Sequence, residues 1–479
     1  MRTDVVPQLS FGQTPIAEVI LNAESRFELI PILAGLQHLY DDLESRTQLL
    51  ELIAADLLDE VSAKHGREGM SLWQVLVMAA IRQGCNYDYA ALEHAANHDD
   101  LVRQFMETGP LSGERFGEST IHENVSRLRP QTLEEITYLI AGVGHQLVPE
   151  AMEKIRGDSF VVQTNIHYPT DSSLLVDGIR RITSLSRELA NVIGADSWRQ
   201  SKHLHKKAKR LDRKINRIAR GRASDRSEQL KQAYGELIEL SCEITDRALD
   251  LFVATRGSPD GSWIGIQRQE ILQYVVKTDY AASIAKRRAV DGETIPNEEK
   301  IFSLFETHTE LIKRGKRPVA NEFGHRVLVV EDAGGFLVHV EVMGTSVQDV
   351  EMVKPTMTAI QERLEEKVKQ ASFDRGFWSP ENFKDLKAAV ELACLPAKGQ
   401  VAAEEQTDEF ITARHHHAGI ESKIAALQHG NGQARCRDKG EAGYARYVML
   451  GAMARNLQNL GRILLNRQAE AERRKKKAA

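Results

Sequence analysis

The sequence predicts a mixed α/β protein in which a helical N-terminal segment precedes a strand-containing core, and a long helical segment interrupts that core. Three observations lead to this prediction. Helical periodicity runs through residues 1–150, strand-like apolar runs occur at residues 158–166 and again from residue 323, and helical periodicity returns between them. At 479 residues, with 42% hydrophobic residues, the chain can bury sizeable cores and divides into about three domains by length alone.

Charge and cysteine content limit the possible classes of protein. The 63 Lys and Arg nearly balance the 68 Asp and Glu, so a surface that binds nucleic acid has to be local. The four cysteines are far apart and include no Cys-x-x-Cys pair, which argues against a thiolate metal site or a disulfide framework and is typical of a reducing cytosol. The first residues lack an apolar signal core, and no run of about 18 apolar residues occurs, so we expect a soluble protein with no membrane contact.

The N-terminal segment has recognisable helix boundaries. Ser71 is expected to cap a helix that ends at Gly84, and Asp88 to begin the next one. Ser119 is expected to cap a short, exposed helix with several polar residues. These residues are His122, Asn124, Arg127 and Arg129. A helix-turn-helix unit can place such a helix in a DNA major groove, but three-helix packing without DNA has the same pattern, so both interpretations stay open.

The helical segment in the middle of the chain carries a basic cluster at residues 199–222, "RQSKHLHKKAKRLDRKINRIARGR". Eleven Lys or Arg residues stand there against a single acidic residue, Asp212. Intrahelical ion pairs cannot neutralise so one-sided a run, which favours a surface that faces phosphates over a merely solvated helix face. The candidate DNA contacts are Lys206, Lys207, Lys209, Arg210, Arg213, Lys214 and Arg217.

The remainder of the chain alternates strands and helices. Two apolar runs joined by Asp332–Gly335 predict a hairpin, and an amphipathic helix at 347–370 leads to a short strand that ends at Asp374. Ser379 and Pro380 suit the N-cap and first position of the next helix. The prediction is completed by a further strand at 393–399, a helix at 404–430, an apolar helix at 443–468 and an unstructured basic tail.

Three carboxylates stand out because of their places in this order. Asp158 is expected to open the first strand, Asp374 to end a later one, and Glu421 to lie on a helix. Converging from two strands and a helix, they would form an oxygen-rich site for two Mg²⁺ or Mn²⁺ ions, which could serve a phosphodiester displacement. Asp171 and Asp349 compete for the first two positions, but Asp171 follows a Pro169 turn and Asp349 falls in the first turn of a helix, where a carboxylate is favoured anyway.

The run of three histidines, His415–His417, does not predict a zinc site. Adjacent residues of a helix point about 100° apart, so three in a row cannot all bind one ion on a regular helix. No Cys or further His lies at a zinc spacing from them.

Four segments resemble the successive catalytic blocks of bacterial insertion-sequence transposases of the DDE type, most closely the group known as ISNCY. They are "DSFVVQTNIHYPTDSSLL", "NEFGHRVLVVEDAGGFLVHVEV", "ASFDRGFWSPEN" and "HHHAGIESKIAALQHGNGQARCRDKG". The N-terminal helices are similar to the domain that precedes the core in those elements. The resemblance implies a ribonuclease-H-like core in which Asp158, Asp374 and Glu421 match the metal-binding triad.

The implied domains follow from the resemblance. They are a helical N-terminal domain, expected to bind DNA, at 1–150, the first core strand at 151–172, a helical insertion at 173–318, the rest of the core at 319–467 and the basic tail at 468–479.

The chain departs from the family downstream of the second aspartate. Relatives often place Tyr, Arg and Lys around the glutamate, whereas Arg414, His417 and Gln428 hold those positions here, with Lys423 nearby but off register. Arg414, His417 and Glu421 fall at i, i+3 and i+7 and would share one helical face. Arg414, His417 and Lys423 are therefore expected to contact DNA phosphates.

The resemblance implies a transposase that cleaves transposon ends and joins them to target DNA. Water would attack a phosphodiester at the transposon end, and the freed 3′-hydroxyl would then attack the target. The expected partners are double-stranded DNA and at least one further copy of the chain, in the bacterial cytoplasm at the nucleoid. Two alternatives stay open: a DNA-binding regulator that has lost catalysis, and a metal-dependent nuclease that cuts without joining.

Overall fold

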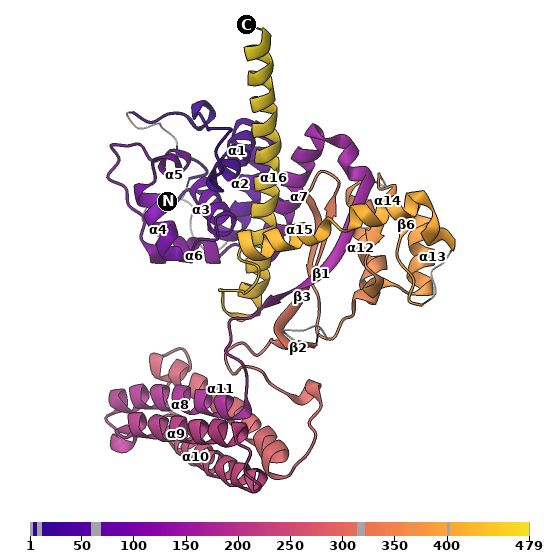
Figure 1. The fold of residues 1–479 in the computed structure, drawn as a ribbon. Coiled ribbons are helices and arrows are strands. Elements are labelled where there is room, and N and C mark those ends of the chain that lie inside the picture. Colours follow the sequence, from indigo (N-terminus) through magenta and orange to yellow (C-terminus); the bar gives the residue numbers. More distant parts are fainter. Residues whose placement is uncertain are drawn as a thin grey trace. The chain divides into compact units, whose positions relative to one another are not determined.

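The structure is a computed structural model that describes residues 3–6, 12–58, 69–313, 321–365, 367–399 and 403–478. The chain forms two compact units (Figure 1). The first unit combines Met1–Thr164 with Gly324–Ala479, and the second is Asn165–Phe323. The protein is mixed α/β, as the sequence predicts, but the N-terminal helices belong to the same unit as the strands of the core.

A mixed sheet of six strands is the framework of the protein. Its order is β2-β3-β1-β5-β6, and β4 also pairs with β3. β3 is antiparallel to β1 and β4, whereas β5 is parallel to β1 and β6. The strands are β1 (Lys154–Gln163), β2 (Glu310–Lys313), β3 (Asn321–Asp332), β4 (Leu337–Val342), β5 (Gln370–Phe373) and β6 (Leu392–Cys394).

The hairpin between β3 and β4 is the one that the sequence predicts. The amide of Gly335 donates to the carbonyl of Asp332 over 3.1 Å, and Asp332 Oδ1 accepts from the amide of Phe336 over 2.9 Å. Gly335 has a φ of +80°, a conformation that favours glycine. The turn is therefore closed by the residues that signal it in the sequence.

Helices cover both faces of the sheet. Successive side chains of β1 point to opposite sides, so they pack in two different cores. Ile155 packs in a core with α12 (Asp349–Arg363) and α13 (Pro380–Ala389). Phe160 and Val162 pack in a second core with the N-terminal helices and α16 (Gly440–Ala478). Ser379 caps α13 and Pro380 begins it, as predicted, but α12 ends at Arg363, well before the predicted residue 370.

Seven α-helices lie in the described residues of the N-terminal part of the first unit. Ser71 caps α3 through a capping box with Gln74, and Asp88 caps α4, as predicted. The cap expected at Ser119 is wrong, because α6 begins at Glu118 with Gly117 as its N-cap. The helices are α1 (Leu29–Asp41), α2 (Leu43–Leu57), α3 (Leu72–Gly84), α4 (Tyr89–His98), α5 (Asp100–Phe105), α6 (Glu118–Ser126) and α7 (Pro130–Leu147).

The exposed polar helix expected at residues 118–129 is only partly exposed. Asn124 is buried and donates to the carbonyl of Thr120 within the same helix. Arg129 is bound to the buried carboxylate of Asp56. These two polar side chains serve the packing of the N-terminal helices.

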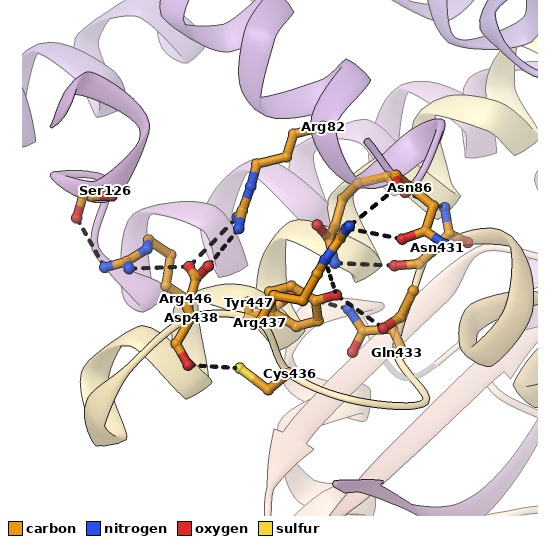
Figure 2. Close-up of polar contacts among 12 residues, drawn as sticks. Arg82, Asn86, Ser126, Asn431, Gln433, Cys436, Arg437, Asp438, Arg446 and Tyr447 are labelled. Carbon is orange, nitrogen blue, oxygen red and sulfur yellow. Dashed lines mark hydrogen bonds and ion pairs between the residues drawn. The ribbon is translucent and has the colours of Figure 1, made fainter. Parts of the chain in front are cut away.

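A buried ionic cluster joins the N-terminal helices to the C-terminal part of the chain (Figure 2). The carboxylate of Asp438 lies between the guanidinium groups of Arg82 on α3 and Arg446 on α16, and the side chain of Arg82 is 2% exposed. Arg446 also donates to the carbonyl of Ser126 on α6 over 2.9 Å. The N-terminal helices are thus bound to α16 by charge as well as by the shared hydrophobic core.

The helix α16 continues far beyond the core. It reaches Ala478, so the expected unstructured tail at 468–479 is helical over its described residues. The charged residues of this last part, Arg473 to Lys477, are exposed.

The second unit is a bundle of four long helices, which confirms the helical periodicity of this segment. α9 and α11 each pack against both α8 and α10 (Figure 1). Asp171 stands in the first turn of α8 and forms an ion pair with Arg288 over 2.7 Å. The helices are α8 (Asp171–Ile193), α9 (Ser201–Arg220), α10 (Arg226–Ala254) and α11 (Trp263–Ala285).

Across the described ranges of both units, no helix combines the length and apolar character needed to cross a membrane.

Replacing Asp438 with Asn should destabilise the first unit strongly. The change leaves the buried guanidinium of Arg82 without its carboxylate, and loss of one partner of a buried ion pair costs about 3–5 kcal/mol. Chemical denaturation monitored by circular dichroism measures the loss. Glu404→Gln, which removes the exposed ion pair with Lys387, is the control and should cost about 0–1 kcal/mol. Equal losses in the two variants would contradict the importance of the cluster.

Candidate functional site

Asp158 lies on β1, and Asp374 directly follows β5, the neighbouring parallel strand. Asp158 is the fifth residue of β1, not its first as the sequence suggested. β1 and β5 pair with Arg156 opposite Ser372 and Gly157 opposite Phe373, so the next step of the same register sets Asp158 beside Asp374. Adjacent strands are about 5 Å apart. The sheet therefore brings together two aspartates that are remote in sequence.

A glycine makes this close pairing possible. A Cβ at Gly157 would stand 2.6 Å from Cε1 of Phe373 and 3.0 Å from Cγ2 of Val330. Any larger residue directly before Asp158 would push the neighbouring side chains away.

Glu421 reaches the same region from a short helix. The single helix expected at 404–430 is divided into α14 (Asp408–His417) and α15 (Ile420–Ala425) (Figure 1). A π-helical turn follows α15. Ile420 and Ile424 pack in the same core as Phe160 of β1. Because the helix is broken, the expectation that Arg414, His417 and Glu421 share one helical face is wrong.

A buried ionic network fixes the break between the two helices. Glu331 of β3 is 0% exposed, and its Oε1 accepts from Nε of Arg156 over 2.7 Å. Arg156 also donates to the carbonyl of His416, at the end of α14, where a cation is favoured by the helix dipole. A Cβ at Gly419 would collide with the Arg156 guanidinium. The glycine and the arginine together set the position at which α15 begins.

Lys423 belongs to this network and does not face DNA. Its Nζ lies 3.1 Å from Oε2 of Glu331 and donates to the carbonyl of Gly335 over 2.6 Å. Burial lowers the pKa of Lys423, and the Glu331 carboxylate opposes that shift. The expectation that Lys423 contacts a phosphate is therefore corrected: the side chain ties α15 to the β3–β4 hairpin.

Burial and like charge act together on Asp158. Burial raises the pKa of Asp158 to about 7, and repulsion by Asp374, Glu421 and Asp349 adds to the shift, while the amide of Ser159 opposes it. The three predicted carboxylates are thus near enough to influence one another.

Asp349 is a fourth member of this carboxylate group. It lies in the first turn of α12, as the sequence predicts, although the helix begins at Asp349 and not at residue 347. Its Oδ1 accepts from Oγ of Ser159 on β1 over 2.8 Å. The sequence analysis set Asp349 aside because a carboxylate is favoured in the first turn of any helix, with or without a role in a site. The polar Ser159 directly after Asp158, in an otherwise apolar strand end, is the signal that could have pointed to it.

The other two expected phosphate contacts on α14 differ from each other. Arg414 is exposed, whereas His417 is half-buried. Burial lowers the pKa of His417, and the charges of Asp374 and Glu421 oppose that shift. His417 thus lies on the carboxylate side of α14, and Arg414 stays open to solvent.

The donor set suits a hard divalent ion, although the side chains do not converge as they stand. Within the described parts of the chain, no three His, Cys, Asp or Glu side chains form a group that could hold a metal ion. Carboxylate oxygens are the ligands that Mg²⁺ prefers. Asp374 and Glu421 are exposed, so their side chains have room to turn toward Asp158. The residues fit such an ion in type and in their place on the sheet.

The basic cluster forms one exposed side of α9 in the second unit. An apolar stripe anchors the helix, with Leu204, Ala208, Leu211 and Ile215 buried. The carboxylate of Asp212 accepts hydrogen bonds from Ser172 Oγ over 2.7 Å and from Asn216 Nδ2 over 3.0 Å. Lys214 pairs with Glu236 over 3.0 Å and is the exception among the predicted contacts. Six exposed cations have no ion pair among the described residues: Lys206, Lys207, Lys209, Arg210, Arg213 and Arg217.

Comparisons of the chain with protein-family models, with curated proteins and with solved structures find no match.

Replacing Glu331 with Gln should destabilise the first unit more than replacing Lys423 with Met. The first change leaves two buried cations without a carboxylate, which costs about 3–5 kcal/mol, whereas the second leaves Glu331 paired with Arg156. Urea denaturation of both variants measures the difference. A larger loss for Lys423→Met would contradict the central place of Glu331 in the network.

Proposed function

We propose that the protein is a DDE-type transposase, which cleaves DNA at transposon ends and joins the freed ends to target DNA with the help of divalent metal ions. The observation that carries this proposal is the pairing of Gly157 on β1 with Phe373 on β5, which Asp158 and Asp374 directly follow. Glu421 is near enough to repel the Asp158 carboxylate. A cluster of acidic side chains repels phosphate by itself, so it serves a DNA-binding protein only if cations join it.

The sheet supports a ribonuclease-H-like core for the first unit. Three antiparallel strands, β1, β3 and β4, are extended on the other side of β1 by the parallel strands β5 and β6. Helices cover both faces. This arrangement is compatible with such a core, and the second unit interrupts it between β1 and β3.

The carboxylates have separate roles in the proposed reaction. Asp158 on β1 and Asp374 directly after β5 would hold the ions, and Glu421 on α15 would complete the ligand set. Bound divalent ions would activate the attacking hydroxyl and stabilise the leaving oxygen. Asp349 acts as a positioning residue, because its hydrogen bond to Ser159 holds the α12 end against β1.

The exposed side of α9 supports double-stranded DNA as the partner. Its six cations are free of carboxylates among the described residues, and such a surface binds the phosphate backbone without reading the sequence. Bringing two transposon ends together requires at least two copies of the chain on DNA.

Asp374→Asn should abolish cleavage and joining while sparing DNA binding. The change removes one ligand charge next to Asp158 and leaves α9 intact. Purified protein is incubated with Mg²⁺ and duplexes that carry the repeats flanking the gene, and the products are separated on a denaturing gel. Asp385→Asn, an aspartate of α13 paired with Lys354, is the control and should retain activity.

The products of the unmodified protein decide among the possible functions. Joined products support the transposase, whereas cleavage without joining shows a nuclease and a mobility shift alone shows a DNA-binding protein. Activity that survives in Asp374→Asn would contradict the site.

Asp158→Asn should remove the stabilisation of the protein by Mg²⁺. In EDTA the variant should unfold at a higher temperature than the unmodified protein, because it lacks a buried charge that three carboxylates repel. Mg²⁺ should stabilise only the unmodified protein, by about 2.7 kcal/mol at an ion concentration a hundred times the Kd. Thermal unfolding in EDTA and in Mg²⁺ measures both effects. A similar Mg²⁺ effect on both proteins would contradict the assignment of Asp158.

A further inference from the structure

The loop between the π-helical turn and α16 alternates exposed cations with buried residues. Arg435, Arg437 and Lys439 are exposed. The residues between them are buried, with Cys436 1% exposed and the side chain of Asp438 7% exposed. This period of two resembles the alternation of a strand and places all three cations on the solvent side.

The backbone of this loop is fixed against the end of β1. Gln163 donates its amide to the carbonyl of Ala434 over 3.2 Å and accepts from the amide of Cys436 over 2.7 Å, which forms a parallel bridge with Arg435. Asp438 is held between Arg82 and Arg446 (Figure 2). The loop is thus anchored at both ends, so little backbone freedom remains to be lost when a ligand binds.

The positive charge of the loop is not neutralised within the described residues. Arg435 donates to the side-chain amide oxygen of Gln163 over 3.1 Å. Arg437 donates to Oδ1 of Asn86 over 2.8 Å (Figure 2). Both cations therefore bind neutral partners. Lys439 forms no described ion pair. Between residues 431 and 446 the sequence has two acidic residues, Asp438 and Glu441, and two arginines already share Asp438.

The position of the loop suits a duplex held at the carboxylates. Gln163 is five residue steps beyond Asp158 on β1, which corresponds to about 17 Å along the strand. One turn of B-form DNA is about 34 Å long. The loop is therefore about half a helical turn from Asp158, within the same compact unit.

We propose that Arg435, Arg437 and Lys439 form a second site for the phosphate backbone of DNA, in addition to the basic side of α9. The loop holds the duplex beside the reacting phosphate, in the unit that carries the carboxylates, and reads no bases because its contacts go to phosphates. This inference rests on the proposed function for its partner.

The test is a triple variant, Arg435→Gln with Arg437→Gln and Lys439→Gln, studied as full-length protein. Fluorescence anisotropy with a labelled duplex in EDTA gives the Kd at a series of KCl concentrations. Each phosphate contact contributes about 0.9 to the slope of log K against log salt, so the slope should become shallower by about 2 to 3.

Two comparison variants accompany the triple variant. The matched control is Lys354→Gln with Lys384→Gln and Lys387→Gln on α12 and α13, and the second is Lys206→Gln with Lys209→Gln and Arg213→Gln on α9.

The control variant should leave the slope unchanged, and the α9 variant should reduce it separately from the loop variant. An unchanged slope in the triple variant, with DNA binding by the unmodified protein intact, overturns the loop site and leaves the proposed function standing. Absence of DNA binding by the unmodified protein overturns both. Binding to vesicles that contain phosphatidylserine but not to DNA, lost in the triple variant, overturns DNA as the partner.

Folding of the triple variant is checked by its thermal midpoint. If the midpoint falls, the single variant Lys439→Gln takes its place, because Lys439 has no described partner to lose. It should reduce the slope by about 1, and an unchanged slope would overturn the loop site as well.

Discussion

The register of β1 against its neighbours is the constraint on which the candidate site depends. Because side chains alternate along a strand, a slip by one residue would turn Asp158 to the opposite face of the sheet, away from α15. Two features oppose such a slip. Gly157 is the position that admits the ring of Phe373, and Arg156 must meet Glu331 on β3, directly opposite in the β1–β3 pairing. The residues that precede Asp158 thus determine where its carboxylate lies.

The same ion pair connects strand register to helix position. Arg156 binds Glu331 on one side and the end of α14 on the other, and Lys423 brings α15 to the same carboxylate. Buried charges of this kind add little net stability, because desolvation offsets most of their attraction. Their effect is on specificity: an arrangement that separated any one of them would leave a charge buried alone. The network therefore selects a single placement for the helix that carries Glu421.

Local signals predicted much of this fold, and long-range contacts explain what they missed. Helix caps and turns could be predicted because they depend on a few neighbouring residues. Examples are the caps Ser71, Asp88 and Ser379 and the Asp332–Gly335 turn. The break at Gly419 was not predicted, since it depends on Arg156, which is remote in sequence.

The site shows the same division between local and long-range information. The sequence indicated Asp158, Asp374 and Glu421 by their places in the order of elements, and the structure brings their charges near one another. Lys423 was misassigned because a lysine on a helix is usually solvated, and its burial depends on Glu331 and the hairpin. Asp349 was set aside and the loop cations were overlooked, because their surroundings depend on strand pairing and packing and not on neighbouring residues in the sequence.

The chain leaves the β1–β3 pair for the second unit and returns to it at opposed positions. Gln163, near the start of this unit, and Gly324, just after its end, are partners in the β1–β3 pairing. Directly opposed residues of antiparallel strands have Cα atoms about 5 Å apart, a gap that a two-residue turn can close. The four-helix bundle is thus an outgrowth of what would otherwise be a plain hairpin. An insertion at this position lengthens one connection without rethreading the sheet, so a change in the size of the bundle leaves the pairing of β1 with β3 intact.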